Sequence, residues 1–200
     1  GFYNESFIDE LAHAAGADPY QYRRKHLPEG GRHQKVLDAV AKDAGWGTPL
    51  PAGRGRGIAI VECFGTICAH VIEASVKDDG TPKVHAVWAA VDCGPVVNPL
   101  NAEAQVMGGI VMGLSAAIGE AITLDKGAVQ QTSFGDYPIL KMAESPPSVS
   151  VRFMASDAPM GGLGEPGLPP AAPALANALF AVTGQRVRTL PFLNQAGAKS

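Results

Sequence analysis

One carboxylate, Glu165, has the surroundings in the sequence that best suit chemistry. It lies in the stretch Gly161-Gly162-Leu163-Gly164-Glu165-Pro166-Gly167, among four glycines and a proline. Glycine lets the backbone adopt unusual angles and places nothing bulky over the carboxyl group. Two interpretations are open from these residues alone. Glu165 is either a loop carboxylate that favours the N-terminus of a following helix, or a general base presented to a substrate.

A general base needs a pKa near the working pH, whereas glutamate in water titrates near about 4.3. Burial raises the pKa of a carboxyl group. The apolar neighbours Met160, Leu163 and Leu168 could provide such burial. No second acid lies nearby, because the closest is Asp157 and no Asp or Glu follows Glu165. Proton transfer at this loop would therefore depend on Glu165 alone.

The same glycines, at positions 162, 164 and 167, also spell the G-x-G-x-x-G pattern of dinucleotide-binding folds. That motif requires a helix to begin within the glycines, so that free N–H groups meet a pyrophosphate. Four prolines follow instead, and proline removes donors and disfavours helix in the residue before it. They are Pro166, Pro169, Pro170 and Pro173. The acid that such sites place about 20 residues later is also missing, so we reject a Rossmann site.

Other catalytic and metal-binding patterns are weak. Gly113-Leu114-Ser115-Ala116-Ala117 resembles a nucleophile elbow, but the final glycine is absent and the serine falls within a helical pattern. Cys63, Cys68 and Cys93 form no C-x-x-C pair, and the five histidines show no H-E-x-x-H spacing. We therefore expect buried thiols, surface or core histidines, and no metal site made of protein ligands.

Composition restricts the class of protein. The 200 residues are 46% hydrophobic and 18% charged, as in soluble globular domains. A net charge of −3 predicts no general attraction to nucleic acid. The longest apolar run, 106–118, is shorter than the roughly 20 residues of a membrane span. The sequence starts at Gly1 and enters a helical pattern almost at once, so we expect a fragment of a longer protein.

The elements that must position Glu165 begin with a helical region. Asn4 can cap a helix whose apolar face is Phe7, Leu11, Ala14 and Ala15, with Gly16 as its stop. Asp18-Pro19 starts a second helix that runs to about Leu27, and a third covers 33–44. Residues 1–48 are therefore predicted to form an N-terminal helical arm, and 49–200 a second segment that forms one structural unit with it.

Strand patterns follow the helical arm, which predicts an α+β fold with a hairpin-containing mixed sheet and packed helices. The predicted strands are Ile58–Phe64, Ile67–Lys77, Lys83–Val91 and Ser148–Met154. Asp78-Asp79-Gly80 is a hairpin turn, and a second hairpin spans 120–131. A helix over about 101–118 has an apolar stripe and a face of small residues that backbone or ligand can approach closely. The stripe is Met107, Val111, Leu114 and Ile118; the small-sided face is Gln105, Gly109, Met112 and Ala116. A final helix begins at Pro173 and stops at Gly184.

Taken in order, several motifs resemble the molybdopterin-binding large (beta) subunits of the xanthine oxidase family. The Gly-Glu-Pro-Gly run and the lead-in at 53–57 are most similar to the C-terminal portion of the isoquinoline 1-oxidoreductase and membrane-bound aldehyde dehydrogenase type. The motifs are Asp92-Cys93-Gly94, Val97-Asn98-Pro99, Gln105 with Gly108-Gly109, Gly113–Ala117, Phe134–Leu140, Gly161–Pro170, Ala172–Phe180 and Thr183–Arg186.

The resemblance implies roles for individual residues. Glu165 matches the family's catalytic glutamate, which takes the proton from a molybdenum-bound hydroxyl group. Gln105 matches a glutamine near the metal and the pterin, and Gly108, Gly109 and Gly164 would allow the cofactor to approach closely. The pterin dithiolene holds the metal in this family, so no His or Cys cluster is required. Asp92 and Asn98 also match family positions, although we interpret both as turn-forming residues.

The resemblance also implies cofactors and partners. They are a molybdenum-carrying molybdopterin, in bacteria the cytosine dinucleotide form, the rest of the large subunit, an iron–sulfur subunit and a cytochrome c acceptor. The implied location is periplasmic or membrane-associated. The implied reaction is oxidation of N-heteroaromatic compounds with oxygen from water. The alternatives are aldehyde oxidation at the same centre, or a non-catalytic fragment or assembly module.

Overall fold

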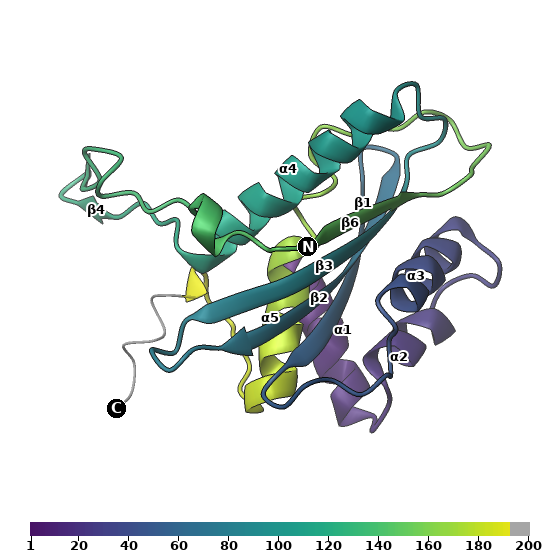
Figure 1. Ribbon diagram of the computed structural model, residues 1–200, viewed down its shortest axis with the longest axis horizontal. Helices are drawn as coiled ribbons and strands as arrows, with labels where there is room; N and C mark the ends of the chain where they lie inside the picture. Colours follow the sequence, from purple (N-terminus) through teal and green to yellow (C-terminus); the bar gives the residue numbers. More distant parts are fainter. Residues whose placement is uncertain (193–200) are drawn as a thin grey trace.

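The framework of the molecule is a four-stranded mixed sheet with the strand order β1-β2-β3-β6, seen in a computed structural model that describes residues 1–192 (Figure 1). The strands are β1 (Gly55–Cys63), β2 (Thr66–Val76), β3 (Pro82–Asp92) and β6 (Val149–Phe153). The first three pair antiparallel through short turns, and β6 joins β3 in parallel. The four predicted strands and the first hairpin are confirmed.

Five α-helices lie among the described residues. They are α1 (Phe2–Ala14), α2 (Pro19–Lys25), α3 (Arg32–Asp43), α4 (Pro99–Ile118) and α5 (Ala171–Thr183). The predicted helices are confirmed within a few residues at each end, including the Asp18 cap, whose side chain accepts from the Gln21 N–H. The predicted α+β class is therefore confirmed. The predicted Asn4 cap is wrong, because α1 begins at Phe2 with Gly1 as its N-cap and Asn4 lies within the helix.

Both faces of the sheet are covered, which explains the almost continuous apolar character of β2. Ile67, Ala69 and Val71 face the cluster formed with α3. Cys68 and Ile72 belong to the cluster on the other face, with α4 and α5. Figure 1 shows α3 and α4 flanking the sheet. The predicted helical arm, 1–48, thus packs on the sheet through α3 and on α5 through α1; its division from 49–200 stays a prediction.

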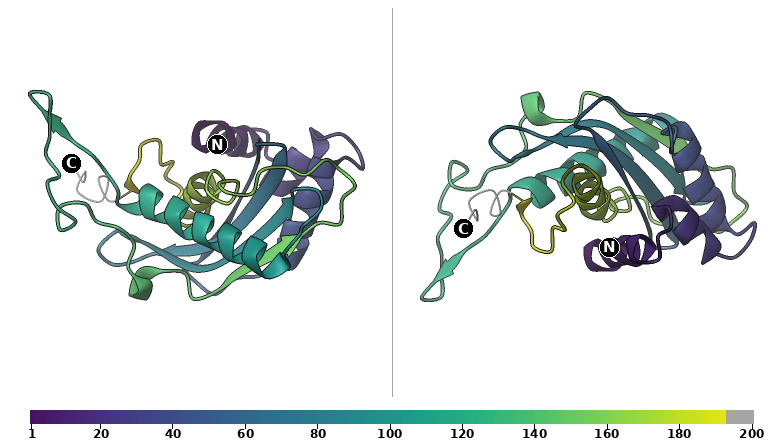
Figure 2. Two further views of the ribbon diagram at one scale, coloured as in Figure 1. Left: turned by 90° about the horizontal axis from the view of Figure 1, so that it is seen from above. Right: turned by 90° about the horizontal axis from the view of Figure 1, so that it is seen from below.

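The second predicted hairpin is present but short. It consists of β4 (Leu124–Asp125) and β5 (Ala128–Val129), which pair antiparallel. The segment that carries it extends away from the sheet and then returns through a 3₁₀ helix, η1 (Met142–Glu144) (Figure 2). Among residues 1–192, no helix combines the length and apolarity needed to cross a lipid bilayer.

The predicted apolar face of α1 is wrong, because this helix turns its polar side inward. Phe7 is 56% exposed and Leu11 is 36% exposed, and Ala14 and Ala15 are exposed as well. The buried residues are Glu5, Ser6, Asp9 and Ala12. Hydrophobic periodicity could not reveal this orientation, because ion pairs to residues far along the chain decide it.

The ion pairs that hold α1 centre on Arg23 of α2. Its Nε donates to Glu5 Oε2 at 2.9 Å, and Asp9 Oδ2 lies 2.7 Å from Arg186 Nη1 beyond α5. Glu5 Oε2 also accepts from the Ile60 N–H at 2.8 Å. That N–H lies on β1, an edge strand, so a side chain satisfies a backbone donor that would otherwise be open to pairing with another chain.

The predicted apolar stripe of α4 is also displaced. Of its four residues only Leu114 is fully buried, and the core face is formed by Val106, Ile110 and Ala117 together with the glycines Gly109 and Gly113. Gly113 lies against the loop before α5, where an added Cβ would stand 2.7 Å from the Leu168 carbonyl oxygen. On the small-sided face predicted for this helix, Gly109 is likewise buried against backbone, with an added Cβ 3.5 Å from the Gly167 Cα atom.

Gly57 makes α5 and β1 approach closely, because an added Cβ would collide with the Ala174 carbonyl and the Ala178 N–H. We predict that Gly57→Ala lowers the free energy of unfolding by about 3 kcal/mol through overpacking. Gly108→Ala is the matched control. An added Cβ there meets nothing within 4 Å, so alanine should stabilise α4 by about 0.5–1 kcal/mol. Urea unfolding followed by circular dichroism measures both, and equal midpoints would contradict the prediction.

Candidate functional site

The loop that carries Glu165 is held on two sides. Before Glu165, the Gly161 N–H donates to the Cys93 carbonyl at 2.9 Å and the Gly162 N–H donates to the Phe64 carbonyl at 2.8 Å. Thr66 Oγ1 donates to the Gly162 carbonyl at 2.6 Å. These bonds attach the loop to the end of β3 and to the β1–β2 turn.

The second attachment is to α4, through Gln105. Its Nε2 donates to the Gly164 carbonyl at 2.6 Å, directly before Glu165. After Glu165, Gly167 is buried against α4, where an added Cβ would lie 2.7 Å from the Val106 carbonyl oxygen. The Leu168 N–H closes the turn by donating to the Glu165 carbonyl at 2.8 Å. The backbone of Glu165 is thus fixed although its side chain is exposed.

The carboxylate itself is free within the described residues, because no hydrogen bond or ion pair of 1–192 reaches it. Its negative charge affects the Cys63 thiol at the end of β1. Burial first, and the negative charge of Glu165 second, raise the pKa of the Cys63 thiol. Glu165 therefore lies near Cys63, on the same edge of the molecule.

The structure brings together several of the residues that the sequence predicts for the site. Gln105 and Gly164 are in contact, and both are exposed beside Glu165. Gly108 and Gly164 have open space in front of the backbone, because an added Cβ would meet nothing within 4 Å. Gly109 is different, since it is buried with an added Cβ 3.5 Å from the Gly167 Cα atom. Its contact with a cofactor stays a prediction.

The two motif residues interpreted as turn-forming have that role. Asp92 Oδ1 accepts from the Gly94 N–H at 3.2 Å, and Asn98 Oδ1 accepts from the Asn101 N–H at 3.1 Å as the N-cap of α4. Asp92 has a further partner that sequence reasoning missed. Arg32, at the start of α3, donates from Nε to Asp92 Oδ2 at 2.8 Å and from Nη2 to Asp92 Oδ1 at 3.0 Å.

Arg32 connects the elements to which the Glu165 loop is attached. Its Nη2 also donates to the Asp92 carbonyl at 3.1 Å, and it reaches the Gly65 carbonyl at 3.5 Å. The hydrogen bonds from Arg32 lower the pKa of the buried Asp92 carboxyl. Arg32 and Asp92 are 60 residues apart, so no local pattern in the sequence could have paired them.

Cys68 and His70 are close to each other and are of residue types that can act as a nucleophile and a base, but this pair is inert. Cys68 Sγ lies 3.4 Å from His70 Nε2 within the sheet. Burial raises the pKa of the Cys68 thiol and lowers the pKa of His70 to about 3. The thiol and the imidazole are therefore both neutral near pH 7, and they do not form a nucleophile and base.

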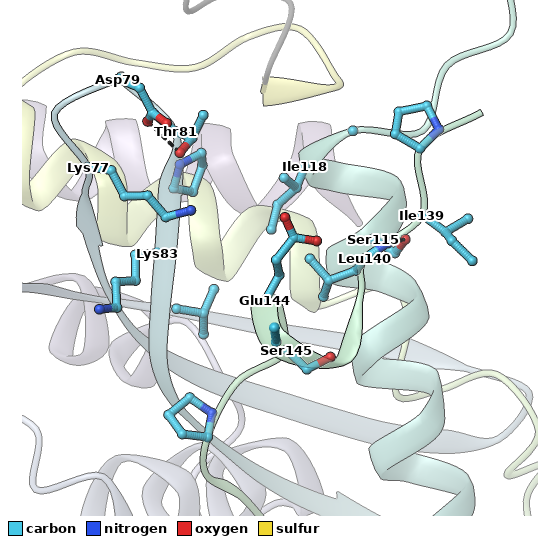
Figure 3. Close-up of a pocket in the computed structure, with 16 residues that line it drawn as sticks. Lys77, Asp79, Thr81, Lys83, Ser115, Ile118, Ile139, Leu140, Glu144 and Ser145 are labelled. Carbon is cyan, nitrogen blue, oxygen red and sulfur yellow. Dashed lines mark hydrogen bonds between the residues drawn. The ribbon is translucent and has the colours of Figure 1, made fainter. Parts of the chain in front are cut away.

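One hollow of the described structure lies away from Glu165. A pocket of about 590 Å³ opens between the β2–β3 hairpin, the C-terminal end of α4 and residues 138–147. Figure 3 shows Lys77 from the hairpin and Glu144 from η1 on opposite sides of it. Neither Glu165 nor Gln105 lines this pocket. Within 1–192, no group of three or more His, Cys, Asp or Glu is placed to bind a metal ion.

Comparison with known proteins gives a consistent result. The sequence matches the family described as molybdopterin cofactor-binding domain over residues 8–146. It is 36% identical to the isoquinoline 1-oxidoreductase subunit beta of Brevundimonas diminuta, over 95% of this chain and 25% of that protein. It is 30% identical to the membrane-bound aldehyde dehydrogenase (pyrroloquinoline-quinone) of Gluconacetobacter polyoxogenes, over 94% of this chain and 27% of that protein.

The fold has a counterpart among solved structures. The aldehyde oxidoreductase of Desulfovibrio desulfuricans superposes with a TM-score of 0.74 over 96% of this chain and 39% of its own, at 15% identity. At that identity the likeness concerns the fold alone. The chain spans about a quarter of the length of the two curated relatives, and Glu165 lies beyond the residues matched by the family.

The Arg32–Asp92 pair yields a prediction of pH-dependent stability. Removing Arg32 leaves the 4%-exposed Asp92 carboxylate without its ion-pair partner, so Arg32→Gln should lower the free energy of unfolding by about 2 kcal/mol at pH 7. Because the folded-state pKa of Asp92 is lowered, this stabilisation is complete above the ordinary value of 3.8 and is lost as the pH falls through the folded-state pKa. Urea unfolding at pH 7 and at pH 3 tests this, and a pH-independent difference would contradict it.

Proposed function

Because this chain belongs to the molybdopterin cofactor-binding domain family, among the molybdenum-binding subunits of the xanthine oxidase family of oxidoreductases, we propose that it supplies the general base of an enzyme that oxidises N-heteroaromatic compounds. The oxygen comes from water, and Glu165 is the base. The single observation that supports this role is a carboxylate exposed on a backbone fixed from both sides.

The residues present suit a pterin cofactor at this edge. Gln105 uses Nε2 to hold Gly164, and within 1–192 no hydrogen bond reaches its Oε1, which leaves an acceptor free. Gly108 and Gly164 leave backbone open to a closely approaching group. We propose that Gln105, Gly108, Gly109 and Gly164 hold a molybdopterin, in the cytosine dinucleotide form. The name of the Gluconacetobacter relative mentions pyrroloquinoline-quinone, but the family match over 8–146 favours molybdopterin.

A bound molybdenum cofactor would supply the two-electron oxidation and the water-derived oxygen. The part that this chain would contribute is the acceptance of a proton. A carboxylate oxygen of Glu165 would accept the proton that is released as water-derived oxygen is transferred to the substrate carbon. In the free chain the side chain is solvated, and a substrate bound over it would exclude that water. The hydrogen bonds from Gln105 and Thr66 hold the loop in place, so substrate binding would change the solvation of the carboxylate more than the position of its backbone.

Aldehyde oxidation at the same centre is the second candidate, and the name of the Gluconacetobacter relative favours it. Both reactions use an electron-poor carbon and the same base. Turnover of isoquinoline and of an aliphatic aldehyde by the assembled enzyme separates the two. Failure with both substrates would remove both candidates.

We propose the rest of the large subunit as the first partner. Tyr3, Phe7 and Leu11 follow one another at intervals of about one turn on the outward face of α1, and Tyr3 is 79% exposed. An apolar stripe of this kind needs cover, and about three-quarters of the length of the curated relatives lies outside the matched region. An iron–sulfur subunit and a cytochrome c acceptor are proposed as electron acceptors. The proposed location, periplasmic or membrane-associated, has support from the word membrane-bound in the Gluconacetobacter name.

The base assignment predicts that Glu165→Gln in the assembled enzyme lowers kcat at least about a hundredfold, because the amide cannot accept the proton. Molybdenum and pterin contents should be unchanged, since the variant keeps the size of the side chain. Glu29→Gln is the matched control, because Glu29 is exposed on the loop between α2 and α3. Steady-state turnover with metal analysis measures both, and near-normal turnover of Glu165→Gln would exclude the assignment.

A further inference from the structure

We infer that Phe64 is a substrate-contacting residue whose ring forms a wall beside Glu165 and favours planar aromatic substrates. This inference rests on the proposed function, because it concerns the substrate of the same site. The observations that support it are the backbone conformation of Phe64, its position against the Glu165 loop and the exposure of its ring.

The backbone of Phe64 is in an unfavourable conformation. Phe64 and Gly65 form the two-residue turn between β1 and β2, with φ values of 54° and 75°. Turns with two positive φ angles strongly prefer Asn, Asp or Gly, since a bulky side chain is strained there. Strained non-glycine residues persist where the surroundings hold them, and they concentrate at functional sites.

Phe64 lies directly against the loop of the proposed base. Its carbonyl accepts from the Gly162 N–H at 2.8 Å, and an added Cβ on Gly162 would stand 3.0 Å from the Phe64 Cβ. Gly162 precedes Glu165 by three residues. On the other side, Cys63 is the neighbour whose thiol pKa responds to the Glu165 charge. Phe64 and the loop that carries Glu165 therefore lie side by side.

Core burial within this chain does not compensate the strain, because Phe64 is 63% exposed. Met160, which precedes the same loop, is 62% exposed. An apolar aromatic surface next to a single carboxylate suits a planar, electron-poor ring, which can stack on Phe64 while its carbon lies within reach of the base. Offset or edge-to-face aromatic pairs are worth about 0.5–1.5 kcal/mol beyond the buried area.

Phe64→Asn separates a substrate contact from a structural role. Asparagine tolerates the positive φ better than phenylalanine, so the melting temperature of the assembled enzyme should stay equal or rise. The dissociation constant of isoquinoline should increase about tenfold if a stacking contact is lost. Binding is measured by equilibrium dialysis in the Glu165→Gln background, where no turnover is expected. Phe134→Asn is the control, because Phe134 is 94% exposed on the extended 120–141 segment.

Weaker isoquinoline binding in Phe64→Asn, with unchanged cofactor content and a melting temperature that is equal or higher, supports the inference. An unchanged dissociation constant, or no measurable isoquinoline binding to either enzyme, overturns it. A lower melting temperature or loss of cofactor also overturns it, since the ring would then pack against the rest of the subunit. Failure of the proposed function is seen separately, as normal turnover by Glu165→Gln.

Steady-state kinetics with otherwise wild-type enzyme provide a second test of the role of Phe64. Phe64→Asn should raise KM for isoquinoline about tenfold, whereas Phe134→Asn should leave it within about twofold. An equal KM for the two variants would contradict selection by the ring.

Discussion

Close backbone contact on both sides of Glu165 is the constraint on which the rest of the site depends. Gly161 lies so near the β1–β2 turn that an added Cβ would stand 2.8 Å from the Gly65 carbonyl oxygen, and Gly167 is equally close to α4. Side chains at either position would push the loop away from its hydrogen-bond partners. Gln105 then fixes the peptide directly before Glu165. The glycines thus serve contact between backbone segments, and the prolines that follow keep the loop from becoming helix.

Polar contacts attach α1 and the start of α3 to this framework, in addition to the apolar packing of α3 on the sheet. Glu5, Asp9 and Arg23 hold α1 by its polar side, and Arg32 holds the end of β3 through Asp92. Buried charges are stable only when they are paired and hydrogen-bonded. These contacts therefore fix how α1 and α3 are oriented on the rest of the molecule. The consequence for α1 is that its apolar side chains Tyr3 and Phe7 face outward, where further protein can cover them.

Much of the fold was predictable because its signals are local. Asp78-Asp79-Gly80 marks the β2–β3 turn, and Asp18-Pro19 marks a helix start that the structure confirms. The prediction for α1 failed because the partners of Glu5 and Asp9 lie up to 177 residues away. The α4 stripe was displaced because glycines, which carry no apolar signal, form part of its core face. At the site, the hydrogen bonds from Gln105 to Gly164 and from Arg32 to Asp92 likewise join residues that are far apart in the sequence. The glycine-rich setting of Glu165 was visible in the sequence, whereas the fixing of its backbone was not.

The pH dependence of substrate oxidation tests the central claim, that Glu165 accepts the proton, most directly. In stopped-flow experiments with the assembled enzyme and isoquinoline, the rate of enzyme reduction should fall at low pH with a single ionisation, as the carboxylate becomes protonated. The same profile should lose this acid limb when residue 165 is glutamine, which cannot titrate. An acid limb that persists unchanged in the glutamine variant would show that another group is the base and would contradict the account.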